Sequence, residues 1–131
     1  MIYVDACLLS NAMEDEGELG RRTRALLSRR DEVFTISPLV MLEALVLPLR
    51  ADAAERRVKQ ESLFAEFVVL GIDDAAYLLA AEVRAASPGL KTVDALHVAI
   101  AQLGGCAALW TNDQRLATAS AGFAVNVIGA R

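Results

Sequence analysis

Two acidic residues of this sequence follow short apolar runs that have the composition of buried strands. Asp5 comes directly after residues 2–4, and Asp113 comes shortly after residues 107–110. In open α/β sheets, ligands bind in the crevice beyond the carboxyl ends of the strands. Either carboxylate could also serve only as the N-cap of the helix that follows it.

Two further acids interrupt apolar segments with helical patterns. Glu43 is the only charged residue in the segment 37–47, and Asp94 lies in the first turn of the segment 93–103. A buried carboxylate on an apolar helix is costly unless it is paired or bound to a metal. Glu43 could instead lie on a narrow exposed face, and Asp94 could only complement the helix dipole.

The four acids give a stronger indication together than separately. A parallel sheet gathers strand carboxyl ends and the starts of the following helices along one edge, so these carboxylates are expected to converge there. Converging carboxylates repel one another unless a cation lies between them. A site of oxygen ligands suits Mg²⁺ or Mn²⁺ and argues against Zn²⁺. His97, the single histidine, lies three residues after Asp94 and is expected in the core or behind the ligands.

The apolar pattern predicts an α/β fold in which strands alternate with helices around a mainly parallel sheet. Ser37 and Pro38 mark a helix start, Pro48 a helix end, and Thr92 the cap of the helix that carries Asp94. The expected strands are residues 2–5, 33–36, 67–72, 107–110 and 125–128. The expected helices are residues 6–13, 18–30, 38–47, 52–67, 75–86 and 93–103, with a short helix after Asp113.

The composition indicates a single folded domain. The 131 residues are 55% hydrophobic with a net charge of −4, which predicts one folded domain over residues 1–131 and argues mildly against nucleic-acid binding through bulk positive charge. Cys7 and Cys106 are far apart and are expected to be reduced thiols. The first apolar run is too short for a signal peptide, and the uncharged stretch 95–112 is better explained by a helix and a strand than by a membrane span. A cytoplasmic protein without a membrane segment is expected.

The sequence resembles the PIN-domain nucleases, specifically the small VapC-type toxins, over nearly its whole length. The resemblance lies in the order and spacing of four segments: Ile-Tyr-Val-Asp at residues 2–5, Ser-Pro-Leu-Val-Met-Leu-Glu at 37–43, Thr-Val-Asp-Ala-Leu-His-Val-Ala at 92–99, and Thr-Asn-Asp at 111–113. It implies a three-layer α/β/α sandwich and an endoribonuclease acting as the toxin of a toxin–antitoxin pair.

The resemblance also implies the site. Asp5, Glu43, Asp94 and Asp113 would bind one or two Mg²⁺ or Mn²⁺ ions and activate water against an RNA phosphodiester. Thr111 would hold a water or a carboxylate, and Asn112 would shape the turn. Where family members often have Thr or Ser just after the first Asp, this chain has Ala6 and Cys7, which leaves a helper hydroxyl in doubt.

Partners follow from the same resemblance. Five arginines lie within residues 21–30, and Arg21, Arg22 and Arg24 could hold RNA phosphates, although a solvated helix face explains them equally simply. A small antitoxin is expected to place a helix in a groove and a basic side chain near the acids, and a homodimer is expected. The alternatives are a catalytically inactive PIN-like module that binds RNA or protein, and a phosphatase or phosphoacceptor domain built on Asp5.

Overall fold

The computed structural model describes residues 1–129 and contains a five-stranded, entirely parallel sheet within them. The strand order is β3-β2-β1-β4-β5, so the first strand lies in the centre of the sheet. The strands are β1 Ile2–Val4, β2 Phe34–Ile36, β3 Val68–Val69, β4 Ala108–Thr111 and β5 Ala124–Asn126. The prediction of a mainly parallel sheet is confirmed.

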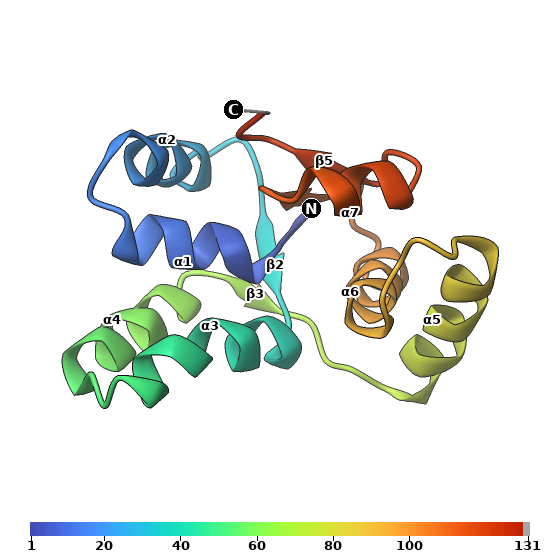
Figure 1. Ribbon diagram of the computed structural model, residues 1–131, viewed down its shortest axis with the longest axis horizontal. Coiled ribbons are helices and arrows are strands. Elements are labelled where there is room, and N and C mark those ends of the chain that lie inside the picture. Colours follow the sequence, from blue (N-terminus) through green and yellow to red (C-terminus); the bar gives the residue numbers. More distant parts are fainter. Residues whose placement is uncertain (130–131) are drawn as a thin grey trace.

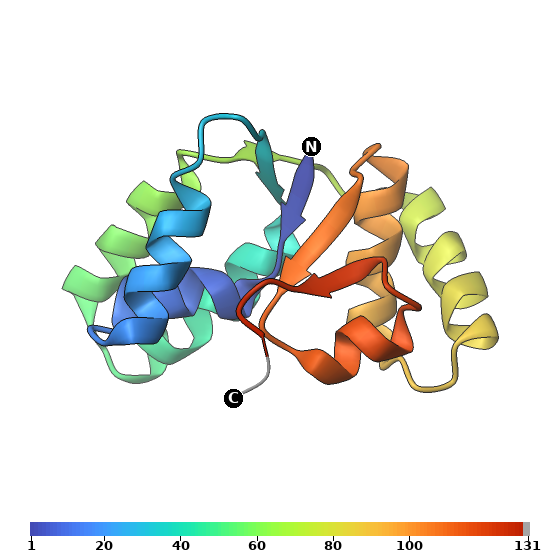
Figure 2. The same ribbon diagram turned by 90° about the horizontal axis from the view of Figure 1, so that it is seen from above.

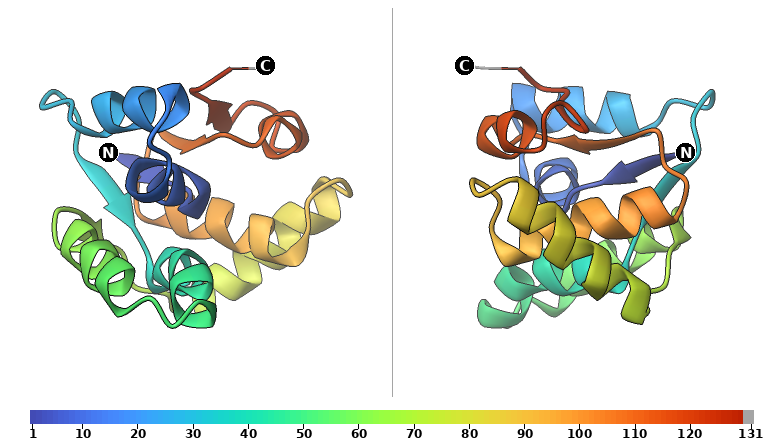
Figure 3. Two further views of the ribbon diagram at one scale, coloured as in Figure 1. Left: turned by 60° about the vertical axis from the view of Figure 1, so that its left-hand side comes forward. Right: turned by 90° about the vertical axis from the view of Figure 1, so that its right-hand side faces the viewer.

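The helices connect these strands (Figure 1). They are α1 Ala6–Glu14, α2 Glu18–Leu27, α3 Pro38–Arg50, α4 Ala54–Phe64, α5 Asp74–Ala86, α6 Thr92–Leu103 and α7 Gln114–Ala119. Seen from above, α1 to α4 lie on one flank of the strands and α5 to α7 on the other, which gives the expected three-layer arrangement (Figure 2). On the second flank α5 packs along α6, and α6 contacts β4 (Figure 3).

The burial of each strand explains how well the sequence predicted it. All residues of β1 and β2 are buried, as expected for parallel strands covered on both faces. The edge strand β3 is exposed at both Val68 and Val69 and is much shorter than the predicted run 67–72. Strand pairing places Tyr3 of β1 beside Thr35 of β2 and Leu109 of β4. The ladder continues one step further, because the Asp5 amide donates to the Trp110 carbonyl at 3.0 Å.

Polar caps start most of the helices that matter for the site. Asp5, Ser37 and Asp113 each accept a backbone amide of the following helix, as the sequence predicted. The prediction of Thr92 as a cap was wrong, because Thr92 is already helical and Lys91 is the N-cap of α6. There the Asp94 carboxylate accepts the Lys91 amide, which supplies the capping contact from inside the helix.

Pro48 does not end α3, which continues to Arg50 with Pro48 buried inside it. A proline in the last turn removes only one helical hydrogen bond, and burial of its ring offsets part of that loss. Among the described residues, no helix is both long enough and apolar enough to cross a membrane.

Candidate metal centre

Asp5 lies where β1 ends and α1 begins, at the carboxyl edge of the sheet. One of its oxygens, Oδ1, accepts the Ala6 amide at 2.8 Å, so the residue does cap α1. The other, Oδ2, accepts the hydroxyl of Thr111 at 2.7 Å. Each carboxylate oxygen has a second lone pair, so neither contact excludes a cation.

Thr111 is fully buried at the end of the neighbouring strand β4 and joins two of the acids. Its Oγ1 donates to Asp5 and accepts the Asp113 amide at 3.0 Å. This hydroxyl therefore fixes the Asp5 carboxylate relative to the turn that carries Asp113.

Cys7 lies beside the same hydroxyl, one position past the residue expected to carry a helper group. Its Sγ is 3.5 Å from both Asp5 Oδ2 and Thr111 Oγ1, and it accepts the Asn112 amide at 3.4 Å. Burial, and then the charge of Asp5, raise the pKa of the Cys7 thiol to about 12, so the thiol is neutral near pH 7. The residue next to the expected position thus offers a protonated sulfur in place of a hydroxyl.

Glu43 reaches the site from α3, and 37% of its side chain is exposed. Its Oε1 forms a short contact with Nε2 of His97 on α6. Ligand atoms of Asp5, Glu43 and His97 all lie within 4.8 Å of one another. The structure therefore brings two of the four predicted acids close together, Asp5 from the end of β1 and Glu43 from α3.

His97 is itself buried and continues into the core. Its Nδ1 lies 2.6 Å from the Tyr3 hydroxyl, which lies 2.7 Å from Oγ of Ser37. Burial raises the pKa of Tyr3, so its hydroxyl stays protonated. This placement agrees with the expected position in the core, and a place behind metal ligands stays a prediction.

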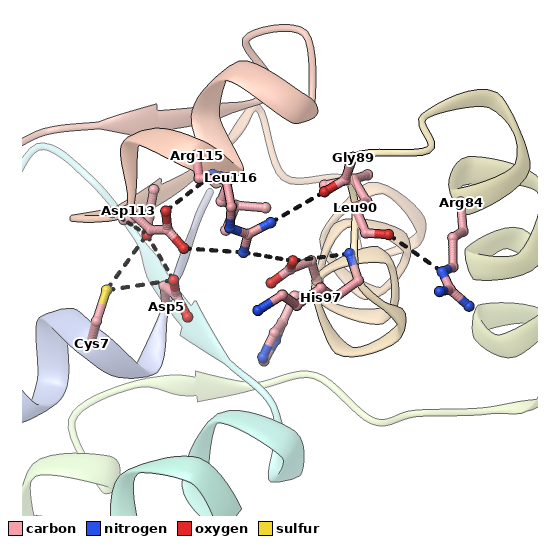
Figure 4. A network of polar contacts seen from close by, with 12 residues as sticks. Asp5, Cys7, Arg84, Gly89, Leu90, His97, Asp113, Arg115 and Leu116 are labelled. Atoms are coloured by element: carbon pink, nitrogen blue, oxygen red, sulfur yellow. Dashed lines mark hydrogen bonds and ion pairs between the residues drawn. The ribbon is translucent and has the colours of Figure 1, made fainter.

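Asp94 and Asp113 converge on an arginine that sequence reasoning missed. Nη2 of Arg115, in α7, is 2.8 Å from Asp94 Oδ2 and 3.3 Å from Asp113 Oδ2. Its Nη1 donates to the Gly89 carbonyl at 3.2 Å (Figure 4). The guanidinium thus supplies positive charge to half of the acidic set.

Signals for the missed residues were present in the sequence. Arg115 lies two residues after Asp113, close enough to fold back over it. Tyr3 is the one polar side chain in the strand Ile2–Val4, and a buried tyrosine hydroxyl needs a partner. The partner itself, His97, is 94 residues away and could not be inferred from spacing.

Each of the three arginines of α2 has a hydrogen-bond or ion-pair partner within the protein. Arg21 pairs with Glu18 on the surface. Arg22 donates to the Ile128 carbonyl at 3.0 Å, and Arg24 donates to the carbonyls of Ala12 and Asp15. These contacts fit the simpler explanation of a helix tied to its neighbours, and a role in RNA binding stays a prediction.

The donor set fits a hard divalent cation. Asp5 and Glu43 offer carboxylate oxygens close to one another, whereas Asp94 and Asp113 are not part of that group and are bridged by Arg115. Carboxylate oxygens are the ligands that Mg²⁺ and Mn²⁺ prefer. His97 could add a nitrogen only by giving up its contact with Glu43.

Known structures share this architecture. VapC20 of Mycobacterium tuberculosis, described as a sarcin–ricin loop cleaving toxin, superposes with a TM-score of 0.78 at 18% identity over 94% of this chain and 96% of that one. A toxin–antitoxin complex from Klebsiella pneumoniae gives 0.78 at 19% identity, covering 96% and 97%. FitAcB from Neisseria gonorrhoeae gives 0.75 at 20% identity, also covering 96% and 97%.

At these identities the structural likenesses establish the fold. No curated protein gives a significant match to the sequence. The family profile described as the PIN domain matches residues 2–121, which is most of the chain. The chain therefore belongs to the PIN domain family.

Proposed function

We propose that this protein is a metal-dependent endoribonuclease that acts as the toxin of a toxin–antitoxin pair. The observation that carries the proposal is the meeting of Asp5 and Glu43 at the carboxyl edge of the sheet, while Arg115 bridges Asp94 and Asp113. Membership of the PIN domain family agrees with this chemistry. Asp5, Glu43, Asp94 and Asp113 are the proposed ligands.

The residues of the site have distinct tasks in this proposal. A bound Mg²⁺ or Mn²⁺ would supply a nucleophilic water near neutral pH and offset charge on the phosphate. Asp5 and Glu43 would hold the ion, and Thr111 orients Asp5 through the 2.7 Å hydrogen bond. Asp94 is only 16% exposed, so its charge acts in a partly shielded environment where electrostatic interactions are stronger.

RNA as substrate and an antitoxin as partner are supported by the structural relatives. VapC20 is described as cleaving the sarcin–ricin loop, and another relative is a toxin–antitoxin complex. Exposed apolar side chains on α3 and α4, namely Leu42, Leu47, Leu49 and Val58, offer surface for a partner or a second copy. A basic side chain of the antitoxin would find Asp5 and Glu43, which Arg115 does not contact.

A cleavage assay tests the enzymatic part. Purified protein is incubated with labelled single-stranded and stem-loop RNA in Mn²⁺, Mg²⁺ or EDTA. We expect cleavage with either metal, none in EDTA, and a loss of about 10²-fold or more in Glu43→Gln and Asp5→Asn, because each removes a charged ligand. Glu82→Gln and Asp74→Asn, which change exposed acids of α5, serve as matched controls and should cleave normally.

The outcomes separate the competing functions. Full activity of Glu43→Gln, or cleavage that persists in EDTA, contradicts the metal mechanism. Wild type that binds the RNA but never cleaves it supports the inactive binding module instead. For the partner, co-expression with the adjacent reading frame should relieve toxicity and yield a co-purifying small protein. A harmless chain with no such partner contradicts the toxin assignment.

A further inference from the structure

A continuous chain of polar side chains leads from Glu43 into the apolar core. Glu43 contacts Nε2 of His97, Nδ1 of His97 lies 2.6 Å from the Tyr3 hydroxyl, and that hydroxyl lies 2.7 Å from Ser37 Oγ. Ser37 Oγ in turn accepts the Val40 amide at the start of α3. The chain therefore begins and ends on α3, the helix that carries Glu43.

The inner members of this chain are almost completely shielded from water. Tyr3 and Ser37 are 0% exposed and His97 is 2% exposed. A buried polar group without a hydrogen-bond partner is costly, so each of these groups must be satisfied by the others. Such a fully connected network fixes side-chain positions more strictly than apolar packing does.

One assignment of protons, with an ionised Glu43 and a neutral His97, satisfies every hydrogen bond of the chain. An ionised carboxylate can only accept, so Nε2 of His97 must donate to Glu43. In a neutral imidazole Nδ1 is then an acceptor, and the Tyr3 hydroxyl donates to it. Ser37 donates to the Tyr3 oxygen and accepts the Val40 amide. Every donor and acceptor named here has a partner in this single arrangement.

The chain also joins the elements that position three of the four acids. Tyr3 lies two residues before Asp5 on β1, His97 lies one helical turn after Asp94 on α6, and Ser37 caps the helix of Glu43. A shift of any one element would break a buried hydrogen bond. The network therefore fixes both the direction of the Glu43 carboxylate and the relative placement of the elements around it.

We propose that His97 and Tyr3 are positioning residues that hold the Glu43 carboxylate toward the metal, an inference that rests on the proposed function. His97 is then a hydrogen-bond donor to a ligand and not itself a ligand, although its Nε2 lies within 4.8 Å of the oxygens of Asp5 and Glu43. The Nε2 proton that orients Glu43 blocks the lone pair that a metal would need. Groups of this kind behind metal ligands are worth about 10- to 100-fold in affinity.

Two substitutions of His97 separate the contact of Nε2 with Glu43 from the contact of Nδ1 with Tyr3. In His97→Gln the amide nitrogen can occupy the place of Nε2 and donate to Glu43, whereas in His97→Asn the shorter amide reaches only Tyr3. We expect His97→Asn to bind Mn²⁺ about 10- to 100-fold more weakly by calorimetry and His97→Gln to stay near wild type. The fold of each variant is checked by circular dichroism.

The tyrosine has a matched control in the same chain. Tyr3→Phe removes the hydroxyl that holds Nδ1, and Tyr77→Phe makes the same change at the only other tyrosine, which is exposed on α5. In the metal-free protein, ¹⁵N NMR of the single histidine should report the Nε2-protonated tautomer in wild type and Tyr77→Phe. In Tyr3→Phe the tautomer signature should shift, and Mn²⁺ affinity should fall.

The results distinguish failure of the positioning role from failure of the proposed function on which it rests. Wild type that binds no Mn²⁺ overturns the proposed function, and the positioning role falls with it. If wild type binds Mn²⁺ but a folded His97→Asn binds it equally well, only the positioning role is overturned. Electron spin-echo spectra of bound Mn²⁺ should show no directly coordinated nitrogen. A coordinated nitrogen would make His97 a ligand and would also overturn the inference.

Discussion

The guanidinium of Arg115 and the carboxylate of Asp94 form an ion pair, with Nη2 2.8 Å from Oδ2. The same nitrogen also contacts Asp113. Arg115 does not contact Asp5 or Glu43. A bound cation would have to compete with Arg115 for the oxygens of Asp94 and Asp113. This arginine supplies positive charge to the carboxylates of Asp94 and Asp113.

Replacing Arg115 by Gln should tighten metal binding. Loss of the guanidinium frees Asp94 and Asp113 for a divalent ion, and we expect Mn²⁺ affinity measured by calorimetry to rise roughly two- to fivefold, the range for a partly exposed ion pair. The metal-free variant should melt at a lower temperature because the acids lose their counter-ion. Arg57→Gln, which breaks the exposed pair with Glu61, is the matched control. Weaker Mn²⁺ binding by Arg115→Gln would contradict the competition.

Divalent metal should stabilise the fold. An ion that binds only the folded protein adds RT ln(1 + [L]/Kd), roughly 2.7 kcal/mol at a hundredfold excess over Kd. We therefore expect Mn²⁺ added to chelated protein to raise the melting temperature, and to raise it less in Asp94→Asn. Asp74→Asn should respond as wild type does. An equal shift in Asp94→Asn would remove Asp94 from the metal site.

Thr111→Val should damage the site while preserving its shape. Valine fills the same space but leaves Asp5 Oδ2 and the Asp113 amide without their buried partner. We expect a loss of about 1–3 kcal/mol in the free energy of unfolding by chemical denaturation, together with reduced RNA cleavage. Thr111→Ser restores the hydroxyl and should recover most of both. Wild-type stability in the valine variant would show that the hydroxyl contributes little.

Cys7 should make the folded protein sensitive to alkaline pH. Its pKa is raised from an ordinary value of 9.0 to about 12, chiefly by burial. Because the folded state disfavours the thiolate, this contribution to stability is fully present below about pH 9 and is lost as the pH rises toward 12. Between pH 9 and 11 the free energy of unfolding of wild type should fall more steeply than that of Cys7→Ala, by up to about 1.4 kcal/mol per pH unit.

Thiol labelling checks the same property independently. Native protein at pH 8 should react slowly at Cys7 with iodoacetamide, and protein in denaturant should react quickly, as assigned by mass spectrometry. Rapid labelling of native Cys7 would show that its thiol is not protected.

The arginines of α2 can be separated by their contacts. Arg21→Gln breaks only an exposed pair, so it should leave stability unchanged and report any RNA contact directly through KM. Arg24→Gln removes donors to two carbonyls around the end of α1 and should lower the melting temperature whether or not it touches RNA. An unchanged KM in Arg21→Gln would remove that residue from the RNA surface.

Much of the fold could be predicted because it depends on local patterns. Runs such as residues 2–4 are apolar throughout, as buried parallel strands require, and Ser37 followed by Pro38 marks the start of α3. The predictions failed where tertiary contacts decided the outcome. Burial keeps Pro48 inside α3, and only pairing with β2 limits β3 to Val68–Val69.

The sequence alone also predicted that four acids would gather, because strand ends and helix starts share one edge of a parallel sheet. Asp5 and Glu43 do meet there. Only the tertiary structure decided which distant side chain each carboxylate contacts. Arg115 pairs with Asp94 and His97 contacts Glu43, and these partners, separated by 21 and 54 residues, become neighbours only when the sheet is assembled. A local pattern fixes where a backbone places a carboxylate, whereas its hydrogen-bond and ionic partners depend on elements that folding brings from elsewhere in the chain.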